Sequence, residues 1–250
     1  MSHTQRLAVL SLMGTLAYYD VSFATASTHI WAPSTDVQQF RIVHLTYDVY
    51  LPAEMDASGR FPAPVTNIGL TIGVIPSSKV QAEIGFDHKA GFGEADRDPL
   101  YFNGKVAVPE AVFGPWQPAV ALGVFDAGTR TATGYNVIYV KGAKSLSAGQ
   151  TVLGRLSLGY FHGSNRLLVG ADDGDDNDGV FGAWERTLAE MSPNLSVCAE
   201  YMGSKSAYGC WSFGGTWKFT ADIGLIAGYS LYNRDDLVGT VTIQLDIDIR

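Results

Sequence analysis

Charged side chains are scarce in this chain of 250 residues, in which Asp, Glu, Lys and Arg together make up 17%. Soluble globular domains carry roughly 25%. Aromatic residues reach 12%, and there are 28 glycines. A low charge together with many Tyr, Phe and Trp residues indicates a protein that exposes much of its surface to lipid.

An excess of basic residues is also missing, because the formal net charge is −8. Without a basic stripe to neutralise phosphates, nucleic acid is excluded as a partner. The acidic residues are instead expected in outer loops or along a water-filled interior.

Long hydrophobic runs are absent beyond the N-terminal region, which excludes a helical membrane anchor. The N-terminus itself is typical of an export signal: Arg6 precedes the apolar run 7–18, and Ala24-Thr25-Ala26 offers a small-x-small cleavage site. We therefore expect a signal peptide at 1–26 and one mature domain at 27–250, the alternative being a retained N-terminal helix. Export without a helical anchor leaves the periplasm, the outer membrane or secretion.

The chain does contain an almost perfect alternation of apolar and polar side chains over residues 237–249, interrupted at Val238 and Gly239. A period of two predicts a β-strand with one apolar and one polar face, and it is longer than the usual five or six residues. Aspartates such as Asp246 and Asp248 do not face a packed core unpaired. The pattern therefore predicts an apolar face against lipid and a polar face against a water-filled lumen.

The same alternation recurs along the chain, with short and long connections in turn. If the sheet closes, residues 237–249 must pair with the first strand around 40–51. The unclear phase of 133–163 and of 179–190 leaves ten or fourteen strands open. Twelve strands are predicted, at 43–51, 67–74, 80–87, 99–108, 117–126, 133–142, 151–163, 179–190, 194–203, 207–219, 222–232 and 237–249.

This pattern resembles the bacterial outer-membrane β-barrels of the porin-like or transporter-like kind, over about residues 28–249. The resemblance rests on the export signal and on the alternation in 43–51, 68–74 and 237–249. It implies an all-β, closed, antiparallel, up-and-down transmembrane barrel in a Gram-negative outer membrane, exported through the periplasm. The opening 28–36 resembles the start of some uncharacterised barrels.

The polar face of the predicted strands supplies the candidate site. Mixed charges there form either a constriction that selects permeants electrostatically or a plug of ion pairs. Since carboxylates outnumber bases, cations are the expected permeants of an open pore. The predicted lumen-lining residues are His44, Asp48, Lys79, Gln81, Glu83, Asp87, Arg155, Glu200, Lys218, Gln244, Asp246 and Asp248.

The two cysteines fall on the polar face of neighbouring strands. A hairpin centred on Ser204 places Cys198 opposite Cys210, where a disulfide is compatible with strand geometry and with the oxidising envelope. Two free thiols are the alternative.

One acidic stretch offers hard oxygen ligands of the kind that Ca²⁺ prefers. Its spacing does not match an EF-hand, and a solvated acidic outer loop is the competing interpretation; ions bridging lipopolysaccharide are a less specific variant. The candidate calcium ligands are Asp172, Asp173, Asp175, Asp176 and Asp178.

Catalysis is not expected. His88 and His162 lie near predicted outer strand ends, and His162 precedes the acidic stretch, so an Asp/His pair that activates water at the rim is the catalytic alternative. No Gly-x-Ser-x-Gly motif occurs.

The leading hypothesis is a narrow channel for small solutes, embedded in outer-membrane lipid and lipopolysaccharide and needing no cofactor. A structural barrel with a plugged lumen, whose loops bind ions, lipopolysaccharide or proteins, is the alternative. A rim-located hydrolase comes third. The pattern predicts no particular oligomeric state.

Overall fold

A computed structural model describes residues 27–250, so the predicted signal peptide at 1–26 lies outside the described residues. Among these described residues, no helix is long and apolar enough to cross a membrane. A short 3-10 helix, η1, spans Gly93–Arg97. The strands are β1 (Val43–Pro52), β2 (Val65–Gly73), β3 (Gln81–Ala90), β4 (Leu100–Val108), β5 (Ala119–Gly128), β6 (Val137–Ala148), β7 (Thr151–His162), β8 (Asp178–Thr187), β9 (Leu195–Met202), β10 (Cys210–Lys218), β11 (Ile223–Tyr232) and β12 (Thr240–Ile249).

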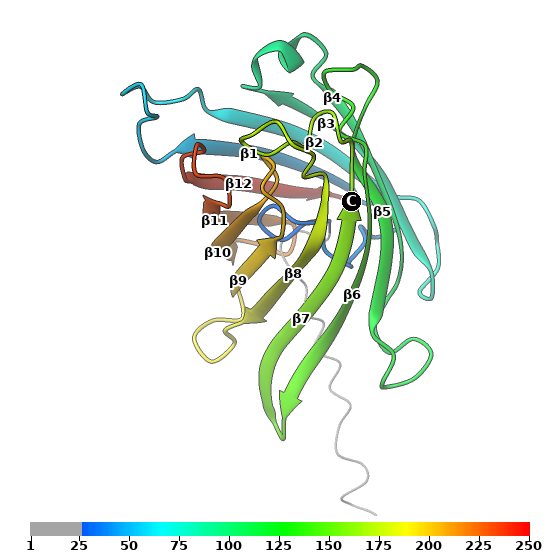
Figure 1. Ribbon diagram of the computed structural model, residues 1–250. Helices are drawn as coiled ribbons and strands as arrows, with labels where there is room; N and C mark the ends of the chain where they lie inside the picture. The colour runs from blue at the N-terminus through cyan, green and yellow to red at the C-terminus, as the bar shows by residue number, and fades with distance from the viewer. Residues whose placement is uncertain (1–26) are drawn as a thin grey trace, which may run out of the picture.

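The twelve strands form one closed antiparallel barrel in which every strand pairs with its neighbours in sequence (Figure 1). The barrel closes where β12 returns to β1, with Val43 opposite Ile249 and Pro52 opposite Thr240. Closure places Asp246 opposite Thr46 on the inner face. The predictions of twelve strands and of this seam are confirmed.

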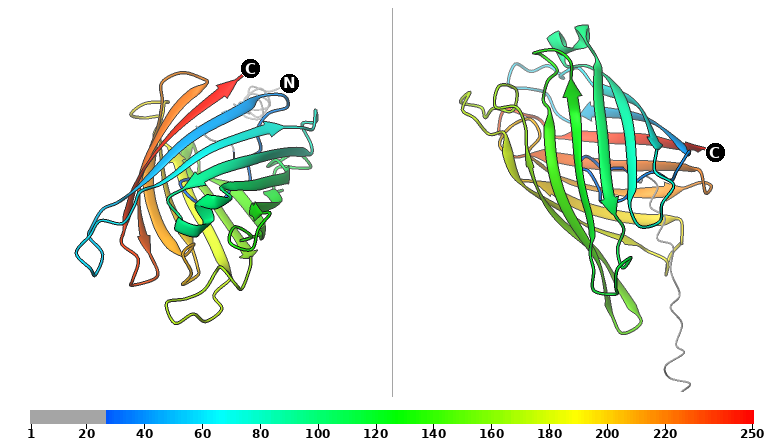
Figure 2. Two further views of the ribbon diagram at one scale, coloured as in Figure 1. Left: turned by 90° about the horizontal axis from the view of Figure 1, so that it is seen from above. Right: turned by 90° about the vertical axis from the view of Figure 1, so that its right-hand side faces the viewer.

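The two ends of the barrel carry different connections. β1 begins and β12 ends at the same end, here called the terminal end (Figure 2). Tight connections such as 149–150 and 219–222 lie there, whereas long ones such as 53–64 and 163–177 lie at the opposite, loop end. Short turns on the side of the termini and longer loops on the other are typical of outer-membrane barrels.

The strand predicted at 133–142 is displaced. β6 starts at Val137 and continues to Ala148, and the two-residue turn 149–150 leads directly into β7. The resulting hairpin projects beyond its neighbours (Figure 1). Apolar residues occupy both faces at the start of β6, with Ile138 exposed outside and Tyr139 buried inside, so alternation alone does not indicate where this strand begins.

The outer surface of the barrel is apolar. Leu158 is 70% exposed on β7, and Ile84 and Ile138 are 56% exposed on their strands. An exposed band of aliphatic residues around a closed antiparallel barrel is the surface that contacts lipid. Aromatic residues add to it, among them Tyr47, Phe86, Phe102, Tyr160, Trp211, Trp217 and Phe219.

A charge on this outer surface tests the lipid contact. We expect Leu158→Arg to lower the free energy of unfolding in lipid vesicles by about 2–4 kcal/mol, the cost of arginine in the hydrocarbon region of a barrel. Met191→Arg is the matched control, because Met191 is 73% exposed but lies in the connection between β8 and β9. Denaturant titration measures both, and equal small effects would contradict a lipid-facing β7.

Candidate functional site

The lumen is occupied by the chain's own N-terminal segment. Residues 27–39, here called the N-terminal plug, precede β1 and run inside the ring of strands (Figure 1). Ile30 is 2% exposed and Ala32 is fully buried. The plug forms only an isolated bridge, between Thr28 and Pro33, and contributes no strand to the barrel. It therefore fills the interior without being part of the wall.

Glu200 on β9 holds the bend of the plug. Its carboxylate accepts hydrogen bonds from the backbone N–H groups of Ile30, Trp31 and Ala32, the shortest being 2.8 Å from Trp31 N. Glu200 is 2% exposed. Hydrogen bonds to an ionised acceptor are stronger than neutral ones, and three convergent donors stabilise this buried charge.

Two wall lysines bind carbonyl groups of the plug. Lys141 on β6 donates from Nζ to the oxygen of Pro33 at 2.7 Å. Lys105 on β4 donates to the carbonyl oxygens of Ser27 at 3.1 Å and Ser34 at 3.3 Å. Both lysines are buried, so the carbonyl groups replace much of the hydration that the ammonium groups lose.

A third cation, Arg155 on β7, binds the plug through side chains. Its Nη1 contacts both oxygens of Asp36, at 2.9 and 2.7 Å, and its Nη2 donates to Thr35 Oγ1 at 2.7 Å. Glu185 on β8 lies 3.5 Å from Arg155 and also contacts His29 Nδ1 at 3.0 Å. This cluster attaches His29, near the start of the plug, and Asp36, near its end, to the neighbouring strands β8 and β7.

Polar contacts continue to the point where the plug joins β1. The N–H of Gln38 donates to Glu83 at 2.6 Å, and its side chain donates to Asp248 at 2.9 Å. Arg41 N donates to the oxygen of Gly73, the last residue of β2. The plug therefore enters the lumen from the terminal end.

Aromatic rings close the lumen toward the loop end. Trp31, in the bend of the plug, packs edge-on against Tyr50 and Tyr208, with 5.6 Å between ring centroids in each pair. Tyr208 stacks on Phe125 and on Tyr135. Burial and the neighbouring Asp126 carboxylate raise the pKa of Tyr208, so its hydroxyl stays protonated and donates to Asp126.

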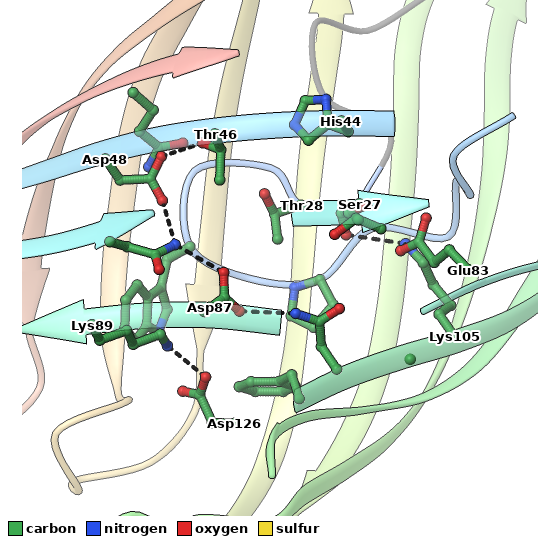
Figure 3. A pocket seen from close by; sticks show the side chains of 18 of the residues that line it. Ser27, Thr28, His44, Thr46, Asp48, Glu83, Asp87, Lys89, Lys105 and Asp126 are labelled. Carbon is green, nitrogen blue, oxygen red and sulfur yellow. Dashed lines mark hydrogen bonds and ion pairs between the residues drawn. The ribbon is translucent and has the colours of Figure 1, made fainter. Parts of the chain in front are cut away.

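A cavity of about 120 Å³ remains beside the plug, along β1 to β5. Asp48, Asp87, Asp126 and Lys89 point toward one another there (Figure 3). The amide of Asn67 bridges Asp48 at 2.9 Å and Asp87 at 3.0 Å, while Lys89 pairs with Asp126. Since a water molecule takes up roughly 30 Å³ in the liquid, this space has room for a few waters beside an excess of negative charge.

Asp126 reaches the lumen through a β-bulge. Its φ is 51°, and the register between β4 and β5 shifts between Phe102 and Gly104. A bulge re-aims side chains locally, so the consecutive residues Phe125 and Asp126 both face inward. Alternation predicts opposite faces for them, and for this reason Asp126 was not among the predicted lumen residues.

The predicted lumen residues are nearly all on the inner face. Lys79 is the exception: the prediction places it in the lumen, but it lies in the exposed connection between β2 and β3, because β3 begins at Gln81. Lys218 lies near the terminal end of β10. The residues that the structure places on the inner face are His44, Asp48, Gln81, Glu83, Asp87, Arg155, Glu200, Lys218, Gln244, Asp246 and Asp248.

Several charged residues that contact the plug or the cavity were not predicted. Lys89 and Lys105 continue the inward parity of strands that alternation does detect, so the signal was present, whereas Glu185 lies in 179–190, where the phase of the alternation is unclear. Lys141 follows apolar residues on both faces, which hides its orientation. The missed residues are Lys89, Lys105, Asp126, Lys141 and Glu185.

The predicted disulfide is wrong. Cys198 and Cys210 are free thiols, and the register places Cys210 opposite Met202 and Cys198 opposite Gly214. The connection 203–209 is centred two residues later than the predicted hairpin, because Ser204 and Ser206 form a hydrogen-bonded turn that Gly209 closes. Both thiols nevertheless lie on the inner face of the barrel.

The acidic loop shows no metal cage. Within residues 27–250, no group of three or more His, Cys, Asp or Glu side chains is arranged to hold a metal ion. The carboxylates engage separate partners: Asp172 accepts from Gly174 N, Asp176 from Lys205 N, and Asp178 from the Tyr160 hydroxyl. The structure gives the calcium prediction for Asp172, Asp173, Asp175, Asp176 and Asp178 no support.

The two histidines considered for catalysis lie outside the lumen. His88 on β3 and His162 on β7 are both exposed and share the outward parity of their strands. His162 is the cross-strand partner of Asp178, whose carboxylate binds Tyr160. The two histidines are on separate strands and do not form one site.

The sequence matches no family of known proteins and no curated protein. Its structure is similar to an outer membrane channel from Pseudomonas putida F1 (10% identity, 85% of this chain and 97% of that chain, TM-score 0.46). It is also similar to KdgM porin (8% identity, 83% and 99%, TM-score 0.49) and to outer membrane phospholipase A from Escherichia coli (10%, 86% and 94%, TM-score 0.44). These likenesses concern the course of the chain alone.

The barrel's own features define its class. A closed antiparallel wall of twelve strands carries apolar residues outside and charged residues inside, with the shorter turns on the side of the termini. This combination is that of a transmembrane β-barrel of the outer-membrane type.

The two native thiols offer a test of the plug. Cys198 lines a small cavity with His29 and Ile30, so the plug shields it. We expect Glu200→Gln to raise the rate at which a small charged thiol reagent modifies Cys198, by roughly tenfold or more, since a hydrogen bond to a charged group contributes about 1.5–3 kcal/mol. Mass spectrometry of the labelled peptide measures this rate.

Asp222→Asn is the control for this change, because Asp222 pairs with Arg250 in the β10–β11 turn outside the lumen. A Cys198 rate unchanged by Glu200→Gln would mean that Glu200 does not hold the plug.

Proposed function

We propose that this protein is an outer-membrane channel for small polar solutes, and that the N-terminal plug closes it. One observation carries the proposal: the inner wall is polar and charged, but a separate, strand-free segment fills it. A barrel built only for structure can fill its interior with wall side chains, as small barrels do. Here the wall keeps a polar interior of the kind found in channels.

The plug is attached in a way that permits movement. Within residues 27–250, it joins the wall covalently only through the residues that lead into β1 at the terminal end. Its polar contacts, such as Lys141 to Pro33 and Arg155 to Asp36, are ones that water and dissolved ions can replace. Withdrawal toward the terminal end leaves every pair of neighbouring strands intact.

The opened pathway favours cations. Asp48, Asp87 and Asp126 face the cavity beside the plug, with Lys89 as the opposing charge. His44 contacts two further carboxylates, Asp246 and Asp248. Rings and clusters of Asp or Glu select cations in membrane pores. A small cationic solute is therefore the proposed permeant class.

The proposed location is the bacterial outer membrane, reached through the periplasm after removal of residues 1–26. The terminal end then faces the periplasm and the loop end faces outward, with lipid and lipopolysaccharide as the surrounding partners.

Substitutions in the plug itself, rather than in the wall, test the proposed channel. In Trp31→Ala/Asp36→Ala the wall is unchanged, while the plug loses its ring contacts and its ion pair with Arg155. These losses amount to roughly 3 kcal/mol, or about a hundredfold in the ratio of open to closed barrels. Planar-bilayer recordings should show rare openings of the unaltered protein and frequent openings of the variant.

Trp116→Ala/Asp222→Ala is the matched control, since Trp116 is 90% exposed in the β4–β5 connection and Asp222 lies in a turn. Heat-modifiable gel mobility confirms that each variant folds. Folded variants that never conduct at any voltage would overturn the channel proposal.

A plugged structural barrel is the second candidate, and the density of plug contacts favours it. Three cations and four carboxylates of the wall hold the plug, among them Glu200 with its three N–H donors. Persistent silence of the folded Trp31→Ala/Asp36→Ala variant is the result this candidate requires.

The acidic cavity residues should set the ion selectivity of the opened barrel. Adding Asp48→Asn and Asp87→Asn to the Trp31→Ala/Asp36→Ala variant should lower the cation-to-anion permeability ratio by at least about twofold. Reversal potentials in a salt gradient measure this ratio. Asp222→Asn/Asp235→Asn removes the same charge outside the lumen, and an equal effect there would contradict the assignment to Asp48 and Asp87.

A further inference from the structure

We infer that the lumen is a binding site for short peptides, and that the N-terminal plug occupies the place of such a solute. The inference rests on the proposed channel and names a substrate class for it. It is carried by the chemistry of the plug contacts.

The wall binds the main chain of the plug more than its side chains. Glu200 accepts three successive backbone N–H groups, and Glu83 accepts the N–H of Gln38. Lys105 and Lys141 donate to backbone carbonyl groups, and Gln244 donates to the oxygen of Ile30 at 2.7 Å. Any peptide presents these N–H and C=O groups, whatever its sequence. The wall is therefore complementary to a polypeptide main chain.

The plug contacts wall charges of both signs in nearly equal number, whereas carboxylates predominate in the neighbouring cavity. Lys105, Lys141 and Arg155 stand against four wall carboxylates, namely Glu83, Glu185, Glu200 and Asp248. Such a set suits a zwitterion, in which positive and negative groups are separated along one molecule. A simple cation pairs only with the carboxylates of this set and leaves its lysines and arginine without a partner.

Two positions match the ends of a free peptide. Arg155 binds both oxygens of the Asp36 carboxylate through Nη1, and a guanidinium group is a strong hydrogen-bonding partner of carboxylates. Glu200 already gathers N–H donors at Ala32. A peptide about as long as residues 32–36 thus places its ammonium group at Glu200 and its terminal carboxylate at Arg155.

The test uses the full chain with the plug weakened by Trp31→Ala/Asp36→Ala, so that a solute meets an unaltered wall. A tethered segment competes at an effective concentration of about millimolar, which the two substitutions offset. Liposomes containing this variant are assayed for uptake of a labelled alanine pentapeptide and of a neutral oligosaccharide of similar mass. Binding of the pentapeptide is measured separately by calorimetry.

We expect the peptide to enter at least roughly tenfold faster than the sugar, and this ratio to fall about tenfold when Glu200→Gln is added, because one charge-assisted anchor is lost. Acetylation and amidation of the peptide ends should reduce the ratio as well, since they remove the charges that Glu200 and Arg155 bind. A synthetic peptide of residues 27–39 should block the current of the variant.

Equal uptake of peptide and sugar would overturn peptide recognition and leave the channel standing. Binding of the residue 27–39 peptide alone, without the alanine peptide, would also overturn it, because the wall would then recognise only its own plug. Peptide binding without any conductance would support the site and contradict the channel.

Discussion

The absence of water in the hydrocarbon layer is the constraint on which this structure depends. Every backbone N–H and C=O group at that depth must pair within the protein, so a sheet there has to close. The pairing of β1 with β12 provides the closure. Once the sheet is closed, its two faces meet different solvents, which is why Ile243 and Leu245 lie outside while Thr242 and Gln244 lie inside.

Closure also creates a problem in the interior. Residues such as Glu200 and Lys141 face a narrow space with little water, and an uncompensated buried charge costs several kcal/mol. The plug compensates these charges with main-chain donors and acceptors. Bulk water does the same when the lumen is filled with it. The charged wall is therefore compatible either with the plug or with water in the lumen. This is the condition for a closed and an open state of one barrel.

Much of the fold was predictable because the alternation of apolar and polar residues along a half-buried strand indicates which side chains face outward and which face inward. The seam between β1 and β12 followed from alternation alone, as did most inward side chains. The prediction failed where a factor other than alternation determines the direction or the register of a side chain. At Asp126 a bulge breaks the period, at Lys141 apolar residues occupy both faces, and at Cys198 the length of a turn sets the register.

Alternation could not predict the plug, because residues 27–39 have no regular structure and their conformation is determined by contacts with the wall. Their contacts divide the lumen into two regions. A region with both cations and carboxylates surrounds the plug, and an acidic cavity with Asp48 and Asp87 lies beside it. Passage requires binding that is distributed over several weak sites. A solute that carries an ammonium group beside peptide amides finds partners in both regions, so the two selectivities act on the same molecule.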